Sequence, residues 1–458
     1  MPNGKPLSSQ KRYAKINKNR SGCEKMSKRK RLSSPPMGWN SWDCYGAAVN
    51  EEQLLGNAAY MAKHLKPYGW EYIVCDIQWY EPSAVGNDYH PFTELCMDEY
   101  SRLIPAENRF PSAAGGKGFR PIADKIHEMG LKFGIHILRG IPRQAVHKNT
   151  KLLGTDKTAR QIAHPFSLCA WNTDMYGVDP DKDGAQEYYD SLFTLYASWG
   201  VDFVKVDDIA NTEFKPHEPY SAKREIEMIR TAIDRCGRDM VLSLSPGPAP
   251  VEFAEHLAEN ADMWRMTGDF WNRWDKLYAM FERCETWYPF VGNGAFPDCD
   301  MLPLGRLCKT ASYCGAKNRM TRFTKDEQRT MLTLWSIFRS PLILGGELRE
   351  TDAFTLSLLT NREVLSLNQN GFGAKPLHVP DDDLRLWCAS DAEKNPVVAV
   401  FNVGETEKSV CLYDLLPVEY RTYSALHDLW SHTDCPYTKD LQIALPPHAS
   451  VLYQLKSN

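Results

Sequence analysis

The sequence lacks the signatures of several large protein classes. Its 13 cysteines are odd in number and scattered, with no Cys-x-x-Cys pair, which argues against a disulfide framework or a zinc site. No apolar run of about 7 to 15 residues, the core of a secretory signal, precedes Met37. No later run is long enough to span a membrane. We therefore expect a cytoplasmic protein with reduced thiols and no membrane association.

Most of the chain carries no excess of positive charge. The formal net charge is −4, yet residues 1–32 carry eleven Lys or Arg against the single acid Glu24. Because this segment carries +10, residues 33–458 carry −14, which argues against nucleic-acid binding by the folded part. Residues 1–34 have almost no apolar side chains to bury, so we expect a disordered basic tail there. Lys28 to Arg31 also fit a nuclear-localisation or anion-binding patch.

Several catalytic motifs are absent as well. The chain has no Gly-rich phosphate loop after its first strand, no Gly-x-Ser-x-Gly elbow and no His-x-His pair. These absences argue against a nucleotide-binding fold and a serine hydrolase. A metal-dependent barrel hydrolase stays open as an alternative, but His136 stands alone between two isoleucines, and a lone strand histidine is more often a packing residue. We expect no metal and no cofactor.

Strand and helix patterns alternate between Met37 and Leu344. This alternation predicts a parallel sheet with crossover helices, and about eight units favour a closed (β/α)8 TIM barrel over residues 35–370. The clearest predicted strands are 37–42, 72–79, 131–137, 200–208, 240–245 and 341–344, and the clearest helices are 50–66, 122–129, 187–199 and those that follow Ser221 and Thr324.

The pattern changes after residue 370. Short strands over 384–389, 397–403, 409–412 and 450–455 are separated by Asp, Asn, Gly and Pro turns. This pattern predicts a C-terminal antiparallel β-sandwich domain over residues 371–458.

One strand ends in a lysine and two aspartates. Side chains alternate along a strand, so Lys205 and Asp207 should share a face while Asp208 points the other way. A cation within a few ångströms favours the ionised acid, which suits a nucleophile or a base. From this stretch alone, capping of the next helix explains these acids equally well.

Other polar groups follow further strands of the predicted barrel, and they should converge on one mouth. Asp269 lies among Gly268, Phe270 and Trp271, so partial desolvation is expected to keep it protonated. Paired with an ionised Asp207, it has the division of labour that glycoside hydrolysis requires. The predicted mouth residues are Trp42, Asp76, Gln78, His136, Lys205, Asp207, Ser245, Arg265, Asp269 and Asp300.

Several motifs occur here in an order that resembles glycoside hydrolase family 27, the clan-D α-galactosidases. The resemblance covers residues from about 35 to the C-terminus and implies a retaining α-glycosidase on a barrel with a C-terminal β-sandwich. The motifs are Met37-Gly38-Trp39-Asn40-Ser41-Trp42, Lys205-Val206-Asp207, Arg265 with Asp269, Asp298-x-Asp300-Met301-Leu302, Leu367-Asn368-Gln369 and Leu445-Pro446-Pro447-His448.

The resemblance implies a role for each matched residue. Asp207 matches the nucleophile and Asp269 the general acid/base. Asp76 matches the first of two aspartates that bind the galactose 4- and 6-hydroxyls. Trp42 matches an aromatic wall of the sugar pocket, Lys205 and Arg265 match residues that hydrogen-bond the sugar, Asp300 matches a carboxylate near the 2-hydroxyl, and His136 stands where the family usually has a tyrosine.

Three departures affect the expected substrate. Ile77 replaces the second of the paired aspartates, Ser245 replaces a frequent glutamate as in α-N-acetylgalactosaminidases, and segment 139–143 has no familiar counterpart. The resemblance therefore predicts an α-galactosidase that acts on an oligosaccharide or glycoside. α-N-Acetylgalactosaminidase and β-L-arabinopyranosidase are alternatives, as is a catalytically dead sugar-binding homologue. A homo-oligomer is also possible.

Overall fold

An eight-stranded parallel sheet forms the centre of the chain. The computed structural model describes residues 31–212, 215, 217–292, 294–310 and 317–457, so most of the predicted tail lies outside the described residues. In the sheet, β13 neighbours β1, and β2, β3, β7, β8, β9 and β10 follow in order. Leu302, after β10, forms a parallel bridge with Leu344 of β13 and closes the barrel. The predicted barrel is confirmed. Its strands are β1 (Met37–Asn40), β2 (Tyr72–Cys75), β3 (Lys132–Leu138), β7 (Phe203–Asp207), β8 (Val241–Leu244), β9 (Met263–Arg265), β10 (Phe296–Asp298) and β13 (Leu342–Leu344).

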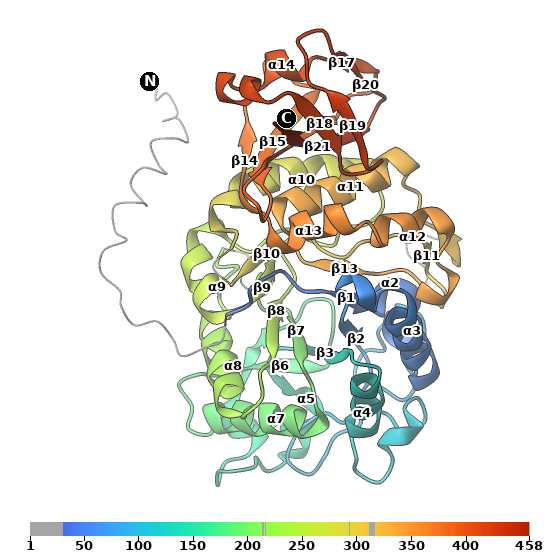
Figure 1. The fold of residues 1–458 in the computed structure, drawn as a ribbon. Coiled ribbons are helices and arrows are strands. Elements are labelled where there is room, and N and C mark those ends of the chain that lie inside the picture. The colour runs from blue at the N-terminus through green and yellow to red at the C-terminus, as the bar shows by residue number, and fades with distance from the viewer. Residues whose placement is uncertain (1–30, 213–214, 216, 293, 311–316, 458) are drawn as a thin grey trace, which may run out of the picture. The chain divides into compact units, whose positions relative to one another are not determined.

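Helices connect and surround these strands (Figure 1). They are α2 (Trp42–Tyr45), α3 (Glu51–His64), α4 (Arg120–Glu128), α7 (Ala185–Trp199), α8 (Lys223–Arg235), α9 (Ala254–Asn260), α10 (Trp274–Trp287), α11 (Lys325–Phe338), α12 (Ala353–Leu359) and α13 (Arg362–Asn370). Short 3-10 turns are η2 (Gly46–Ala48), η3 (Lys66–Tyr68), η4 (Pro111–Ala113), η5 (Val251–Phe253), η6 (Tyr288–Phe290) and η7 (Leu348–Glu350).

Capping boxes fix the start of two barrel helices. Asn50 accepts a hydrogen bond from the Gln53 amide at the start of α3, and Thr324 accepts one from the Glu327 amide at the start of α11. In both boxes the third residue's side chain accepts from the cap backbone in return, which satisfies two otherwise unpaired N–H groups. Both helix starts therefore lie where the sequence placed them.

The long segment between β3 and α7 contains structure that the sequence did not predict. It folds into an antiparallel sheet of three short strands in the order β4-β6-β5. The strands are too short and too irregular for periodicity to reveal them. These elements are β4 (Ile141–Pro142), α5 (Arg143–Lys148), α6 (Ala159–Ile162), β5 (Ala163–Leu168) and β6 (Met175–Val178).

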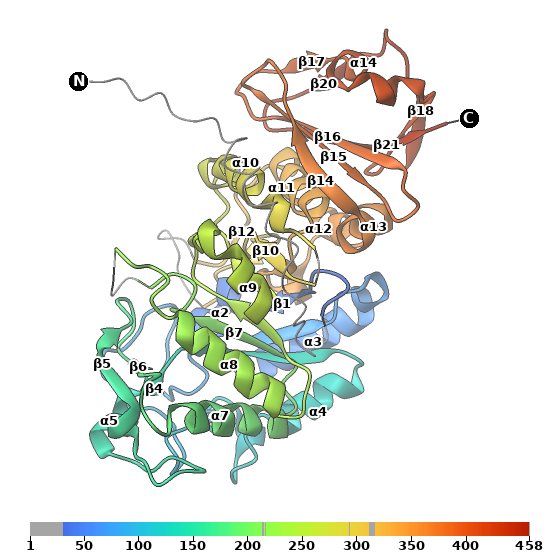
Figure 2. The same ribbon diagram turned by 90° about the vertical axis from the view of Figure 1, so that its left-hand side faces the viewer.

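The C-terminal region is antiparallel, as predicted. A six-stranded sheet has the order β14-β15-β16-β21-β18-β19, and β17 pairs with β20. The region lies over α10, α11 and α13 in both views (Figures 1 and 2). It also holds the short helix α14 (Leu412–Leu415) and η8 (Val418–Thr422), where no helix was expected. The strands are β14 (Phe372–Leu377), β15 (Leu384–Ser390), β16 (Pro396–Asn402), β17 (Lys408–Val410), β18 (Ala425–Asp428), β19 (Thr433–Pro436), β20 (Ile443–Leu445) and β21 (Ser450–Lys456), beside the hairpin β11 (Arg306–Leu307) and β12 (Arg319–Met320) of the barrel region.

Helix α11 links the two regions. Its Thr330 hydroxyl donates to the His448 carbonyl at 2.7 Å, and the Trp430 indole donates to the Thr333 hydroxyl at 2.9 Å. Most side chains of α11 are buried, because one side packs on the barrel and the other meets the C-terminal sheet. The domain boundary that we predict at residues 370–371 falls between α13 and β14.

Within the described part of the chain, we find no helix with both the length and the apolar character needed to cross a membrane.

Candidate active site

A cavity of about 340 Å³ lies where several barrel strands end. The carboxyl ends of parallel strands share one face of a barrel, so side chains from distant parts of the sequence meet there. Seven of the ten predicted site residues line it. The lining residues are Trp42, Asp43, Asp76, Ile77, Tyr89, Trp171, Lys205, Asp207, Pro246, Gly247, Arg265, Gly268, Asp269, Phe270, Trp271, Asp300 and Met301.

Asp207, the last residue of β7, is held by two donors. His136 Nε2 lies 3.1 Å from Asp207 Oδ2, and the Asp208 amide donates to Oδ1 at 3.0 Å. Burial alone would raise the pKa of Asp207, but the hydrogen bond from His136 and the charge of Lys205 outweigh it and hold this pKa well below its usual range. Asp207 is therefore an ionised carboxylate facing the cavity.

Asp76 and Lys205 form a buried ion pair beside it. Lys205 Nζ lies 3.0 Å from Asp76 Oδ2, which also accepts a hydrogen bond from Asn40 Nδ2 at 2.6 Å. Burial disfavours the charge on Asp76, yet Lys205 and His136 lower its pKa overall. In Lys205 the same balance raises the pKa, since the attraction of Asp76 and Asp207 exceeds the cost of burial. Both partners stay charged, and both line the cavity.

Arg265 organises the opposite wall of the cavity. Its Nη2 lies 2.6 Å from Asp300 Oδ2 and 3.3 Å from Asp269 Oδ1. Asp300 also accepts hydrogen bonds from the Phe270 and Met301 amides, each at 2.7 Å. Even so, burial raises the pKa of Asp300 to about 7, because Arg265 only partly offsets it and neighbouring acids add to the shift. The carboxyl group of Asp300 on this wall therefore has a pKa near neutral pH.

The expectation that Asp269 is desolvated by its aromatic neighbours is wrong. Its side chain is 63 % exposed, whereas Phe270 and Trp271, the next two residues, are buried. Sequence neighbours do not decide burial in an irregular loop, since each side chain there can leave in a different direction. Asp269 instead stands at the open edge of the cavity.

Three predicted residues do not line the cavity. Gln78 is fully buried, and its amide donates to Asp174 Oδ2 at 2.7 Å. His136 is fully buried, and its Nε2 lies 3.1 Å from Asp207 and 4.0 Å from Asp76. Ser245 is buried, and its hydroxyl lies 3.5 Å from the Val206 carbonyl. The predicted strand 72–79 ends at Cys75, so alternation along a strand no longer places Gln78.

Several cavity residues were not predicted. Tyr89 stacks on Trp42 with ring centroids 6.0 Å apart and lies 5.6 Å from Trp171, which extends the aromatic wall. Tyr89 and Trp171 both lie in long loops, where no periodicity predicts the direction of a side chain. Their only signal was the length of these loops, which is typical of functional segments.

Asp43 is a further acid that the sequence reasoning missed, although it directly follows Trp42. Among the described residues its Oδ2 has no hydrogen-bond partner. Burial, reinforced by the charge of Asp300, raises its pKa well above the usual range. A Cβ on Gly345 would clash with Asp43 Oδ2, so the glycine provides the room for this side chain.

Arg139 explains the unfamiliar segment 139–143. It is buried, and its guanidinium contacts Asp208 Oδ2 at 2.9 Å and Glu225 Oε1 at 3.0 Å. Asp208 follows the last residue of β7 with φ +55° and does not line the cavity, as predicted for its side chain. Arg139 therefore anchors the residue whose amide holds Asp207.

Two acids that line one cavity at a barrel mouth, together with cations and aromatic rings, are typical of the site of a glycoside hydrolase. A family model described as "Alpha galactosidase A" matches residues 175–370, and one described as "Alpha galactosidase C-terminal beta sandwich domain" matches residues 381–455.

Solved structures extend the match over the chain. A family GH27 β-L-arabinopyranosidase from Geobacillus stearothermophilus is 59% identical with a TM-score of 0.89, covering 93% of this chain and 97% of that one. A candidate α-N-acetylgalactosaminidase from Bacillus halodurans is 52% identical with a TM-score of 0.83, covering 94% and 100%. Alpha-galactosidase 2 from Arabidopsis thaliana is 26% identical over 92% of this chain and 89% of its own. The chain belongs to glycoside hydrolase family 27, as its motifs predicted.

Proposed function

We propose that this glycoside hydrolase is a retaining exo-glycosidase that prefers β-L-arabinopyranosides to α-galactosides. The observation that carries the preference is Ile77, which lines the cavity directly after Asp76. This proposal reverses the order that the sequence motifs favoured, in which α-galactosidase came first.

Ile77 places an apolar wall where the family resemblance implies a second aspartate. A galactose 6-hydroxyl there would lose its hydrogen bonds to water without replacement, which costs about 1 to 3 kcal/mol. β-L-Arabinopyranose has the same ring configuration as α-galactose and lacks only the C6 hydroxymethyl arm. Asp76 and Lys205 stay available for the ring hydroxyls that both sugars share.

The surroundings of Ser245 give no support to α-N-acetylgalactosaminidase activity. A small residue was expected there to make room for a 2-acetamido group, but its side chain lies outside the cavity lining. Pro246 and Gly247 form that part of the wall instead. The similarity to the Geobacillus enzyme supports the same preference as Ile77.

The proposed mechanism is double displacement. The Asp207 carboxylate attacks the anomeric carbon while Asp269 gives its proton to the leaving oxygen, and the glycosidic C–O bond breaks. Water then attacks the same carbon, Asp269 takes the proton, and Asp207 leaves as a carboxylate. The exposure of Asp269 suits this role, because both the leaving group and the incoming water must reach it. The two carboxyl groups should lie about 5 to 5.5 Å apart in the sugar complex.

A panel of p-nitrophenyl glycosides tests the proposal. We expect kcat/KM for the β-L-arabinopyranoside to exceed that for the α-galactoside by about 10-fold or more, with the α-N-acetylgalactosaminide slowest. A higher value for the α-galactoside would refute the preference, and hydrolysis of none of the three would favour the sugar-binding alternative. NMR of the first sugar released should show the anomeric configuration of the substrate; the opposite anomer would refute retention.

Two substitutions at one position separate size from polarity. Ile77→Asp should raise relative activity on the α-galactoside, because a carboxylate can accept from the 6-hydroxyl. Ile77→Val removes one methylene and keeps the wall apolar, so it should change the ratio of the two kcat/KM values much less. Equal ratios in both variants would show that the 6-hydroxyl does not meet this wall.

A further inference from the structure

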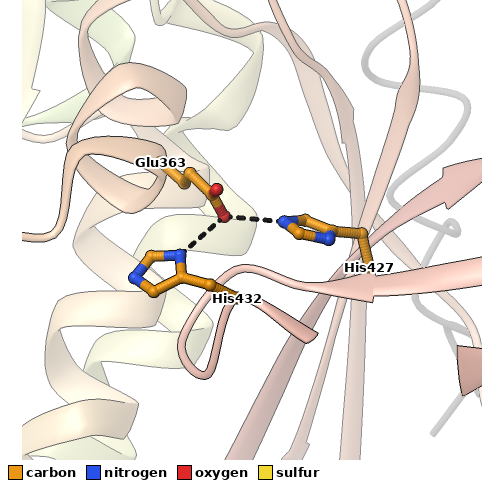
Figure 3. A group of neighbouring side chains, drawn as sticks. All are labelled: Glu363, His427 and His432. Atoms are coloured by element: carbon orange, nitrogen blue, oxygen red, sulfur yellow. Dashed lines mark hydrogen bonds and ion pairs between the residues drawn. The ribbon is translucent and has the colours of Figure 1, made fainter. Parts of the chain in front are cut away.

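Three side chains that the proposed mechanism does not use meet where α13 packs on the C-terminal sheet (Figure 3). Glu363 lies on α13, His427 on β18, and His432 in the turn between β18 and β19. Glu363 Oε2 lies 2.9 Å from His427 Nε2 and 3.1 Å from His432 Nδ1. None of the three lines the cavity at the barrel mouth. One carboxylate oxygen thus faces two imidazole nitrogens.

His427 has a carboxylate at both ring nitrogens. Its Nδ1 lies 2.5 Å from Asp434 Oδ1, opposite it on the neighbouring strand, while Nε2 faces Glu363. A neutral imidazole has one N–H and one lone pair, so it can donate to only one of these acids. The other contact needs either a second proton or a cation between the nitrogen and the oxygen.

The arrangement behind His427 is the one that orients metal-binding histidines. A carboxylate that accepts from one ring nitrogen fixes the tautomer and leaves the other nitrogen's lone pair for a metal. Asp434 occupies this place, and Lys456 lies 3.2 Å from it and balances its charge. The Nε2 lone pair of His427 is then directed at the space shared with Glu363 and His432.

The turn that carries His432 is well defined. Asp428 accepts hydrogen bonds from the Trp430 amide at 2.8 Å through its side chain and from the His432 amide at 2.8 Å through its carbonyl. On the other side, Asn361 caps α13 by accepting from the Glu363 amide at 3.1 Å. Both halves of the cluster therefore stand on ordered backbone.

We propose that Glu363, His427 and His432 bind a divalent transition-metal ion, with Zn²⁺ the best match, which joins α13 to the β18–β19 hairpin. Their ligand atoms all lie within 4.8 Å of one another. Tetrahedral Zn²⁺ with bonds of about 2.0 to 2.1 Å separates its ligand atoms by about 3.3 Å, so the two contacts to Glu363, at 2.9 and 3.1 Å, need to open by only a few tenths of an ångström.

The ligand types and the exposure define the site further. Two imidazoles and one carboxylate suit Zn²⁺, whereas Ca²⁺ and Mg²⁺ prefer oxygen ligands alone. His432 is 51% and Glu363 38% exposed, so water can reach the fourth position. The ion would bind the folded chain only, because these residues meet across the contact between two regions, and binding therefore stabilises that contact.

His448 provides an internal control at the same contact between regions. It too lies between two carboxylates, 2.9 Å from Glu327 and 3.2 Å from Glu405, but its ring stacks on Trp274 rather than facing a second imidazole. It has one nitrogen ligand fewer than the proposed site and should bind a divalent ion far more weakly.

Zn²⁺ titration of the chelator-treated full-length chain, by calorimetry and thermal unfolding, tests the proposal. We expect one ion per chain with a micromolar or lower Kd and a rise in Tm of several degrees. His432→Ala and Glu363→Gln should each weaken binding about 100-fold or more, whereas His448→Gln should leave the Kd unchanged.

Each result decides the matter. Either of two results would overturn the proposed metal site and leave the cluster as a protonated ion-pair network. One is the absence of saturable one-to-one binding, and the other is an unchanged Kd in His432→Ala. Anomalous scattering from a Zn²⁺-soaked crystal should peak between the three side chains; a peak at the cysteines instead would also overturn it. None of these measurements depends on glycosidase activity.

Discussion

Aspartates on the two walls of the cavity have pKa values that are shifted in opposite directions. On the β7 wall, Asp76 and Asp207 share Lys205 and the nearby His136, and the pKa of each acid lies below its usual value although burial opposes this. On the β10 wall, burial raises the pKa of Asp300 and of Asp298, and Arg265 only partly offsets this rise in each acid. Burial opposes ionisation on both walls, so the local balance of cations and acids decides which wall is ionised.

This difference matches the division of labour in double displacement. An attacking carboxylate must be ionised before the substrate arrives, whereas the leaving-group side must be able to hold a proton. The β7 wall supplies the first condition. The β10 wall keeps one acid near Asp269, Asp300, whose pKa burial raises to about 7.

The largest expected effect follows from removing the charge of the β7 wall. Asp207→Asn should lower kcat by roughly four orders of magnitude or more with the fold intact, since the amide cannot form the glycosyl-enzyme. The matched control is Asp208→Asn, the same change one residue on, where the side chain faces Arg139. That variant should keep kcat within about 10-fold. Near-normal turnover by Asp207→Asn would refute its assignment as the nucleophile.

Asp300→Asn removes the acid that titrates on the β10 wall. It also leaves Arg265 with fewer acceptors, so kcat/KM should fall about 10- to 100-fold because the wall loses its fixed geometry. The pKa of Asp300, about 7, should give an inflection near pH 7 in the wild-type kcat/KM profile. This inflection should disappear in the variant. A profile that keeps the same inflection would assign it to another group.

His136→Gln tests the donor behind Asp207. Glutamine can still donate a hydrogen bond but carries no charge, so the pKa of Asp207 should rise. Because Asp207 must be ionised to attack, the acid limb of the kcat/KM profile should move to higher pH, with a smaller change, about 10-fold or less, at neutral pH. An unmoved acid limb would show that Lys205 alone sets the ionisation.

The rules for regular secondary structure predicted much of this site, and they failed for residues outside regular helices and strands. Lys205, Asp207 and Asp208 were oriented correctly because they lie within or directly after a regular strand, where side chains alternate. Gln78 was misplaced because β2 ends three residues earlier, at Cys75. The exposure of Asp269 depends on a loop conformation that no periodicity encodes.

Long-range contacts were the other limit. The buried contacts of Arg139 with Asp208 and Glu225 join three separate parts of the chain, and Glu363 meets His427 only when the C-terminal sheet packs on α13. The barrel and the sandwich could nevertheless be predicted, since the order of the elements and the capping boxes follow from short stretches of sequence.

The smallest effect, and the sharpest test of the comparison, is on stability. Asp43→Asn and Asp76→Asn make the same chemical change at two buried acids whose pKa values are shifted in opposite directions. Folded Asp43 binds its proton more tightly than the unfolded chain does, so its contribution to stability falls as pH rises above about 4. Asp43→Asn should therefore raise Tm by a few degrees at pH 7 and by less at pH 4. Asp76 contributes stability above its unfolded pKa that is lost on acidification, so Asp76→Asn should lower Tm at pH 7 and lose this effect as the pH falls through the folded pKa. Shifts of the same sign in both variants would show that burial, and not the distribution of cations, governs the ionisation of these two acids.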